Sequence, residues 1–322
     1  MHEPQNKNVR SILAWVFLVL LALAAASVLA PLVVRVIDTV SLFESLRRYS
    51  GIKVFRRLVV VFFLLGVWFW RRRLLFLRAD QIGLSRHSAW RRHVIAGLLT
   101  GLAGLFMVQG AAVALGYRVP DRDLDFSVGL FVRVAGKGLA TAVAVGIVEE
   151  VLFRGALFHY LLRRASCPLA VGLTSLLFAV VHFFRSGSIT VDRYSLFLGP
   201  LAAWDLLYGW WEHFDVFPDL VGLMLVSVVL CWSVLLAGDI YLAIGLHTGW
   251  VFVIQCARML FDETSGVSQL LFGGPRSYDG LVGFVLLFLI IPFLHLCVRL
   301  AWIRPARFRS GTGSGGVSLA HD

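Results

Sequence analysis

The sequence predicts an all-α membrane protein, a polytopic bundle of about eight transmembrane helices. Apolar residues make up 59% of the 322 residues, and the mean hydropathy is +0.82, far above the range of soluble globular domains. The apolar runs are continuous rather than alternating, which indicates helices rather than strands. Because lipid cannot hydrate unpaired backbone groups, only helices or closed barrels can cross it. We therefore expect an integral, multi-pass membrane protein.

Eight segments are expected as spans, since about 20 apolar residues are needed to cross a bilayer. The first is too long for a signal peptide and no convincing small-residue cleavage site follows, so we expect it to be retained. The second has only 13 uninterrupted apolar residues, 58–70, and could lie in the interface or re-enter, which would leave seven spans. The expected helices lie near residues 11–34, 54–70, 94–116, 138–162, 169–185, 219–238, 239–261 and 280–301.

The distribution of arginines predicts the orientation of the chain in the membrane. Residues 71–93 carry seven arginines and one acid, Asp80, and further arginines occur at 163–164 and in the C-terminal tail. With eight spans these regions share one side, and the positive-inside rule places both termini in the cytoplasm, in a membrane expected to be a bacterial inner membrane. Residues 35–57 are also basic but would lie outside, so seven spans with an external N-terminus stay open. The opposite loops are neutral or acidic: 117–128, 185–218 and 262–279.

Net charge and cysteine usage exclude several classes of function. The net charge of +11 is interpreted as membrane orientation rather than nucleic-acid binding, because the basic residues lie at the ends of apolar segments. No two cysteines form a CxxC pair, so neither a disulfide framework nor a zinc–thiolate site is expected. We interpret the four cysteines as small apolar residues, namely Cys167, Cys231, Cys256 and Cys297.

Two adjacent carboxylates inside an apolar helix are the strongest functional signal. Glu149 and Glu150 lie in the stretch ATAVAVGIVEEVLFRGALFHYLL, with Arg154 four residues after Glu150. Ionisable residues at this depth are rare and mark functional sites by default. Glu150 and Arg154 share a helix face and can pair, while Glu149 is rotated by about 100°. We therefore expect Glu149 to point into the bundle as a general base. A purely structural ion-pair network would explain Glu150 and Arg154 but not Glu149.

Two histidines in later apolar segments complete the candidate site. His182 lies in LLFAVVHFF and His247 in AIGLHTGW, between Gly245 and Gly249. Each histidine alone is as consistent with one buried hydrogen bond as with catalysis, and the two glycines are interpreted as helix-packing residues. Together, Glu149 could take a proton from water that His182 orients, while His247 stabilises an oxyanion. This combination predicts peptide hydrolysis without a nucleophilic side chain.

Three motifs in separate helices resemble those of the CPBP intramembrane proteases. They are EEVLFR at 149–154, FAVVH at 178–182 and HTGWV at 247–251. The family includes CAAX prenyl-protein endopeptidases and bacterial proteins of bacteriocin immunity and processing, and the resemblance covers about residues 94–300. It implies a helix bundle around a catalytic cavity, with Glu149 as general base and His182 positioning the water. It also implies that Glu150 and Arg154 support the site and that His247 stabilises the oxyanion.

The third motif departs from the family pattern. Where the family often has Asn four residues after the second histidine, this chain has Val251, and no Asn occurs beyond residue 8. Thr248 lies about 100° around the helix, and Gln255 is a further turn along. The oxyanion hole would then consist of His247 alone or include a backbone group.

The chain is expected to contain one membrane domain with two flanking regions. We predict an N-terminal transmembrane section with basic loops at 1–93, a protease core at 94–303 and a disordered Gly/Ser-rich tail at 304–322. Residues 126–137 are expected as an amphipathic lead-in to the fourth span. The aromatic segment 196–211 is expected as a short helix or an interfacial belt.

Two other functions remain open at the level of sequence. One Glu and two His have the ligand types of a catalytic zinc site, although no HExxH spacing occurs. Alternatively, intramembrane Glu and His can form a proton relay in a transporter or belong to a non-catalytic immunity protein. We favour an endopeptidase that needs no cofactor and acts on a membrane-associated protein or peptide in the lipid bilayer.

Overall fold

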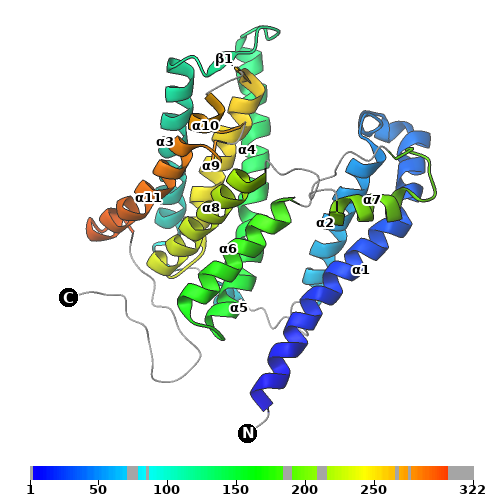
Figure 1. The fold of residues 1–322 in the computed structure, drawn as a ribbon, viewed down its shortest axis with the longest axis horizontal. Helices are drawn as coiled ribbons and strands as arrows, with labels where there is room; N and C mark the ends of the chain where they lie inside the picture. Colours follow the sequence, from blue (N-terminus) through cyan, green and yellow to red (C-terminus); the bar gives the residue numbers. More distant parts are fainter. Residues whose placement is uncertain are drawn as a thin grey trace. The chain divides into compact units, whose positions relative to one another are not determined.

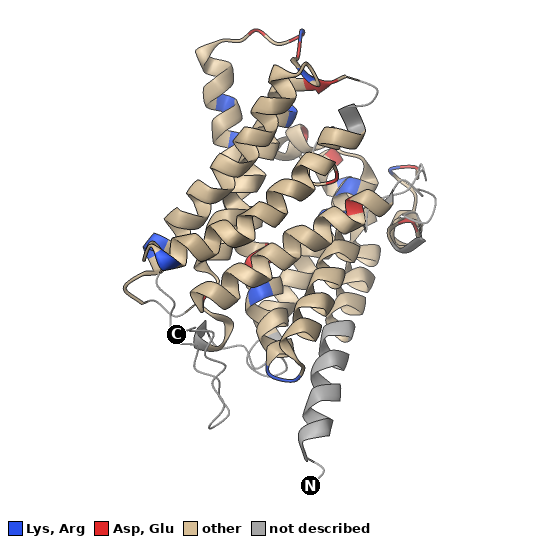
Figure 2. Ribbon diagram, turned by 60° about the vertical axis from the view of Figure 1, so that its left-hand side comes forward, with Lys and Arg blue, Asp and Glu red and all other residues tan. Residues whose placement is uncertain are grey.

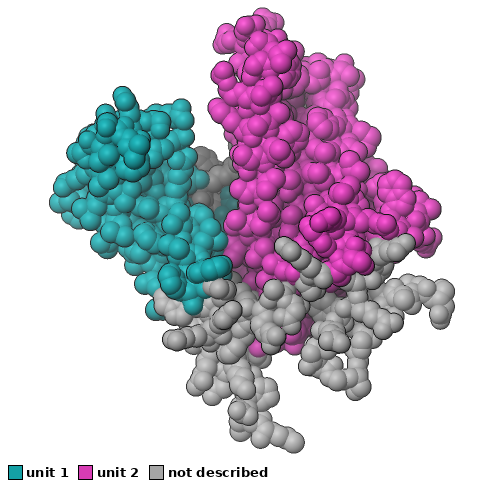
Figure 3. All heavy atoms as spheres, turned by 180° about the vertical axis from the view of Figure 1, so that it is seen from behind, with its two compact units in different colours: residues 1–78, 181–214 teal, residues 79–180, 215–322 magenta. Residues whose placement is uncertain are grey.

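The computed structural model describes residues 3–70, 79–84, 87–183, 191–208, 216–264, 268–274 and 277–303. The predicted all-α, polytopic fold is confirmed (Figure 1). The chain forms two compact units, residues 1–78 with 181–214 and residues 79–180 with 215–322 (Figure 3). The predicted protease core overlaps most of the second unit, and its borders stay a prediction. The predicted tail, 304–322, lies outside the described residues.

The first unit is a helical hairpin with a short helix packed on it. Its elements are α1 (Glu3–Thr39), η1 (Ser41–Leu46), α2 (Gly51–Trp70) and α7 (Leu198–Tyr208). Small and apolar residues of all three α-helices form its core, among them Ala26, Ala30, Phe55, Leu198 and Ala202. The aromatic segment thus contains the expected short helix, α7, while Trp210 and Trp211 lie outside the described residues.

A bidentate ion pair ties the chain before α7 to α1. The Arg193 guanidinium donates from Nε to Asp38 Oδ2 at 2.9 Å and from Nη2 to Asp38 Oδ1 at 2.8 Å, and it also donates to the Tyr49 carbonyl. This two-point geometry is the strongest form of an arginine–carboxylate contact.

The second unit contains the remaining helices and one short two-stranded sheet. Its elements are η2 (Ala79–Ile82), α3 (Trp90–Ala114), β1 (Arg118–Pro120), α4 (Val128–Glu150), η3 (Val151–Phe158), α5 (His159–Leu162), α6 (Cys167–Phe183), α8 (Val216–Ala237), α9 (Tyr241–Leu260), β2 (Phe261–Glu263), α10 (Ser268–Phe272) and α11 (Leu281–Arg299). The last turn of α6 belongs to the first unit. The strands β1 and β2 pair antiparallel, with Arg118 opposite Glu263.

Six helices in the described part of the chain are long and apolar enough to cross a membrane. They are Phe17–Thr39, Trp90–Ala114, Val128–Leu162, Phe217–Ala237, Tyr241–Leu260 and Leu281–Arg299. The predicted span at 169–185 corresponds to the shorter apolar helix Cys167–His182. The predicted span at 54–70 corresponds to α2, whose first two turns contain three cations. These two helices account for the difference between eight predicted spans and six.

The segment predicted as a lead-in to the fourth span is instead the start of that span. α4 begins at Val128, and the Ser127 hydroxyl caps it by accepting the Leu130 N–H at 3.3 Å. The helix continues through η3 and α5, so that residues 128–162 are one rod. The charged residues Arg133 and Lys137 therefore lie on the first turns of the helix that carries the two glutamates.

Glycines bring α3 and α9 into direct backbone contact. A Cβ atom on Gly245 would lie 2.1 Å from the Val94 carbonyl oxygen, and one on Gly97 would lie 2.2 Å from the Leu242 carbonyl oxygen. Such small residues at four-residue spacing allow close helix approach in membranes. The two helices run parallel, since later residues of α3 contact later residues of α9. The interpretation of Gly245 and Gly249 as packing residues is thus confirmed.

Substituting Ala for Gly245 is expected to destabilise the protein, although Ala is the better helix former. The new methyl group would meet backbone atoms of α3, which cannot move aside as a side chain can. We expect a loss of about 1–3 kcal/mol, typical of overpacking, measured as a lower thermal midpoint in detergent. Gly110→Ala on α3 is the matched control, since nothing lies within 4 Å of its Cβ position. Equal midpoints for the two variants would contradict the packing role.

The two ends of the second unit differ in charge. α3 and α9 begin at one end, where α5, α8 and α11 finish, and this end holds the arginines Arg91, Arg92, Arg163, Arg164 and Arg299. The other end, called the sheet end below, carries the β1–β2 sheet and acids such as Asp262 and Glu263. Figure 2 shows that most of the helical length between carries neither sign of charge. The asymmetry agrees with the predicted cytoplasmic position of the basic end, which stays a prediction.

Candidate active site

A stripe of mostly small residues on α4 decides which glutamate faces the bundle. The buried residues of α4 recur every four positions, namely Val134, Gly138, Ala142, Gly146 and Glu150. This stripe packs on α9, where a Cβ on Gly146 would lie 2.4 Å from Thr248 Oγ1. Glu150 ends the stripe and is 0% exposed, whereas the Glu149 side chain is 26% exposed. Glu150 thus pairs with Arg154 as expected and also contacts His247, while the partly exposed Glu149 directs its buried Oε2 atom toward His247.

Glu150 connects the cation and the histidine of the site. Its Oε1 atom accepts a hydrogen bond from Arg154 Nη1 at 2.9 Å and lies 2.7 Å from His247 Nδ1. Because an ionised carboxylate only accepts, Nδ1 of His247 must carry the hydrogen in this contact. Glu150 thereby fixes both the tautomer and the orientation of the imidazole.

Arg154 is fully buried and makes direct contacts with two other helices, α6 and α8. Its Nη2 atom donates to the Ser227 carbonyl of α8 at 3.4 Å, and its guanidinium lies 4.4 Å from the centre of the Phe178 ring of α6. Through Glu150 it also reaches α9. A planar guanidinium suits this set of contacts, because it can stack on an aromatic ring and donate along its edge.

The backbone around Arg154 is a π-helix rather than an α-helix. Such segments are rare and occur mostly as single turns, frequently at functional sites. Here the Arg154 carbonyl accepts from Nδ1 of the buried His159 at 2.5 Å, five residues later. We did not identify His159 from the sequence. In the sequence, His159 stands out only as a polar ring in the apolar run that follows the EEVLFR motif.

The second nitrogen of His247 faces Glu149. The Nε2 atom lies 3.9 Å from Glu149 Oε2, beyond hydrogen-bonding distance but within the range of charge interaction. The ring of Phe178 stands edge-on to the imidazole, with centroids 6.2 Å apart. The imidazole therefore has one nitrogen held by a buried acid and the other turned toward a more exposed one.

The remaining predicted residues are His182 on α6 and Val251 and Thr248 on α9. His182 is half-buried near the end of α6, four residues after Phe178, and it belongs to the first unit. Val251 is half-buried one turn beyond His247, and Thr248 packs against Gly146 of α4. The structure thus brings Glu149, Glu150, Arg154 and His247 together, while the role of His182 stays a prediction.

The site lies closer to the basic end of the second unit than to the sheet end. His247 follows the first residue of α9 by six positions, which is about 9 Å along the helix axis. A substrate approaching from the basic end would therefore need to insert only a short extended segment to reach the imidazole.

Comparison with known proteins identifies one family. Residues 132–253 match the family model described as type II CAAX prenyl endopeptidase Rce1-like. No curated protein and no solved structure matches the chain. The matched segment runs from α4 to α9 and includes all three motifs, and the family is one of proteases, which act on peptides or proteins. The resemblance seen in the sequence is therefore confirmed over residues 132–253, the part of the chain that is similar to Rce1-like type II CAAX prenyl endopeptidases.

Proposed function

We propose that this protein is an intramembrane endopeptidase that hydrolyses a peptide bond with water activated by Glu149. One observation carries the proposal: His247 is held at Nδ1 by the buried Glu150 and faces Glu149 through Nε2. A carboxylate and an imidazole nitrogen that face each other can act on a water and on the carbonyl that it attacks. The side chain of Glu149 is 26% exposed and that of Glu150 is 0% exposed, which favours Glu149 as the acid that contacts water.

In this mechanism Glu149 removes a proton from water as the water oxygen attacks the carbonyl carbon. The carbonyl oxygen becomes an oxyanion, and a doubly protonated His247 donates to it from Nε2 while Nδ1–H stays on Glu150. The proton on Glu149 then passes to the leaving amine as the C–N bond breaks. With His247 protonated, the four side chains Glu149, Glu150, Arg154 and His247 sum to zero charge, which suits a buried cluster.

His182 is proposed to position the attacking water. It follows Phe178 by four residues on α6 and so shares a helix face with it. Phe178 contacts both Arg154 and His247. No cofactor is proposed for the reaction, because a general base and an oxyanion donor supply its two chemical requirements.

The substrate is proposed to be a membrane-associated protein or peptide cut near the cytoplasmic face. The short distance from the basic end to His247 supports access from that side. A prenylated C-terminal tail, a bacteriocin-like peptide and a sorting tail all meet this description.

Comparison of membrane peptides from cells with the wild-type protein and with Glu149→Gln tests the proposed function. New peptide termini should occur only with the wild type, at sites within or next to apolar segments. If the two sets of termini coincide, the protein does not cleave membrane peptides, and a transporter or immunity function gains support. Glu263→Gln, at the sheet end, is the matched control and should give the wild-type termini.

Val251→Asn is expected to raise the turnover rate. Position 251 lies one turn beyond His247 on nearly the same face, so that an amide there could donate a second hydrogen bond to the oxyanion. One such donor is worth about 2.7–4 kcal/mol where the site is built for it. The turnover rate should therefore rise more than the substrate affinity changes.

The control for this variant is Val251→Leu, which has a similar shape and no donor. An unchanged or lower rate with Asn, accompanied by lower thermal stability, would mean that another group completes the oxyanion hole. The loss of stability would then reflect a buried amide without a partner.

A further inference from the structure

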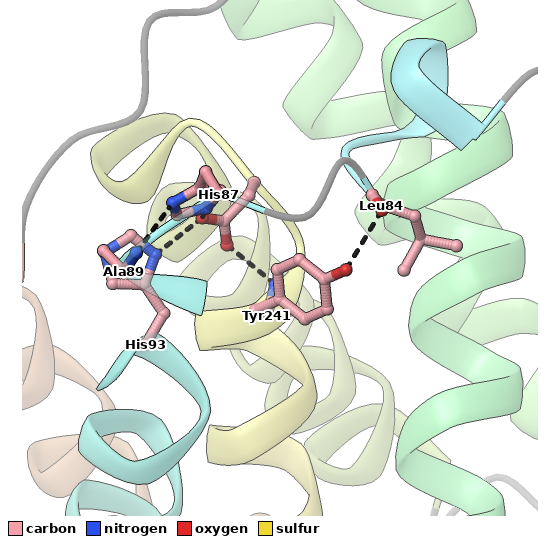
Figure 4. Close-up of polar contacts among 6 residues, drawn as sticks. Leu84, His87, Ala89, His93 and Tyr241 are labelled. Carbon is pink, nitrogen blue, oxygen red and sulfur yellow. Dashed lines mark hydrogen bonds and ion pairs between the residues drawn. The ribbon is translucent and has the colours of Figure 1, made fainter. Parts of the chain in front are cut away.

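A second polar cluster lies at the basic end of the second unit, apart from the candidate active site. His87 precedes α3, His93 lies in its first turn and Asp239 lies in the turn between α8 and α9. Asp239 Oδ2 is 2.7 Å from His87 Nε2 and 2.6 Å from His93 Nδ1 (Figure 4). The three ligand-type atoms all lie within 4.8 Å of one another. His93 and Asp239 are buried, while the His87 side chain is 24% exposed.

A local hydrogen bond occupies one carboxylate oxygen of Asp239, and the other oxygen contacts both histidines. Gly238 has a φ of +74° and makes the turn that places Asp239 ahead of α9. The Oδ1 atom accepts the Tyr241 N–H at 2.8 Å, and the Tyr241 hydroxyl donates to the Leu84 carbonyl at 3.0 Å (Figure 4). The carboxylate is thus oriented by the Tyr241 N–H, and carboxylates that bind metals are usually held by such hydrogen bonds.

We propose that His87, His93 and Asp239 bind a divalent transition metal, with zinc the best fit, at the start of α3 and α9. Two imidazoles and one carboxylate are ligand types of zinc, and three protein ligands leave a fourth position for water. The partly exposed His87 gives the ion an entry path. This site differs from a catalytic zinc at Glu149, His182 and His247, since Asp239 precedes His247 by eight residues, about 12 Å along α9.

In the hydrogen-bonded arrangement, each histidine nitrogen that would bind the metal carries a proton instead. Each ring donates an N–H to Oδ2, and metal binding would replace these protons and separate the ligand atoms to roughly 3.3 Å, as tetrahedral bonds of about 2.0–2.1 Å require. Metal binding at Nε2 would move the proton of His87 to Nδ1. This nitrogen could then no longer accept the hydrogen bond from Ala89 N, which lies 3.2 Å away. Uptake of the metal should therefore release protons and weaken as the pH falls.

The metal would link α3 and α9, which already pack against each other through their glycines. α9 carries His247, so an ion at its start would restrain the helix that carries the imidazole relative to α3. Because Asp239 lies 152 and 146 residues from the two histidines, the three ligands come together only in the folded chain, and the metal should stabilise that state.

Zinc analysis of purified protein without an oligohistidine tag tests this site. Elemental analysis after dialysis should find about one zinc per wild-type chain, and zinc added to stripped protein should raise its thermal midpoint. His87→Gln and His93→Gln should lose both effects. His295→Gln, whose ring accepts from Trp232 on α8, is the matched histidine control and should keep them. Glu149→Gln should also keep them.

Cobalt provides a readout that does not depend on the folding of variants. Stripped wild-type protein should show the intense visible absorption of a four-coordinate Co²⁺ ion, and zinc should displace it. Absence of bound metal in the wild type would overturn the proposal and leave a His–Asp–His hydrogen-bond cluster. Zinc that persists in both His87→Gln and His93→Gln but disappears in Glu149→Gln would place the metal in the active site and overturn it as well.

Discussion

Glu149→Gln is expected to abolish peptide cleavage, with a loss of about 10²-fold or more in the turnover rate. The amide has nearly the same shape as the carboxylate but cannot accept a proton from water, and general-base catalysis contributes about 10²–10⁴-fold. The side chain is 26% exposed and lies 3.9 Å from His247, so the substitution leaves the buried contacts of Glu150 intact. Folding should therefore be unchanged. The measurement is cleavage of a membrane-peptide substrate in lipid vesicles, with thermal unfolding followed in parallel.

Glu150→Gln is the informative comparison for this experiment. It changes the acid that holds His247 and Arg154, so that both activity and stability should fall. If Glu149→Gln retained activity while Glu150→Gln lost it without unfolding, the buried acid would be the base and the roles proposed for the two residues would be reversed.

The helices of this protein could be predicted because their apolar runs are long and uninterrupted. Six expected spans match helices of sufficient length, whereas α2 and α6 are limited by three cations and by length respectively. The start of α4 was missed for a different reason. Arg133 and Lys137 make residues 126–137 look amphipathic, although Ser127 caps a helix that begins there.

The arrangement of the active site was only partly predictable. The spacing of Glu150 and Arg154 predicted their ion pair, which the structure contains. The face of α4 that packs on α9 is set by Gly138, Ala142 and Gly146, and Glu150 continues that series. A helical wheel for the two glutamates alone contains no information about the neighbouring helix, so it could not assign the buried acid.

Two other features depend on tertiary structure and have little local signal. The π-helix after Glu150, next to which the His159 ring contacts the Arg154 carbonyl, has no recognisable sequence pattern. The His87–His93–Asp239 cluster joins positions 146 and 152 residues apart. Neither histidine forms a metal-binding motif with its neighbours in sequence, and only the parallel packing of α3 and α9 brings them to Asp239.

Arg154→Met is expected to cost about 3–5 kcal/mol of stability, because it leaves a buried carboxylate without its cation. Arg154 is 0% exposed, and its hydrogen bond to Glu150, its donation to Ser227 and its stacking on Phe178 would all be lost. Met fills much of the same volume, so the loss reflects charge and hydrogen bonding rather than a cavity. Thermal or denaturant unfolding in detergent measures the effect.

Two further variants separate the buried ion pair from general effects of losing an arginine. Arg163→Met removes an arginine at the end of α5 that donates to the Gln81 carbonyl at 3.2 Å, and it should cost less than about 1 kcal/mol. The double variant Glu150→Gln with Arg154→Met should be more stable than Arg154→Met alone, because it removes both members of the pair. An Arg154→Met protein as stable as the wild type but inactive would mean that Arg154 takes part in the chemistry, by stabilising negative charge on the reacting carbonyl. In that case the double variant would gain no stability over the single one.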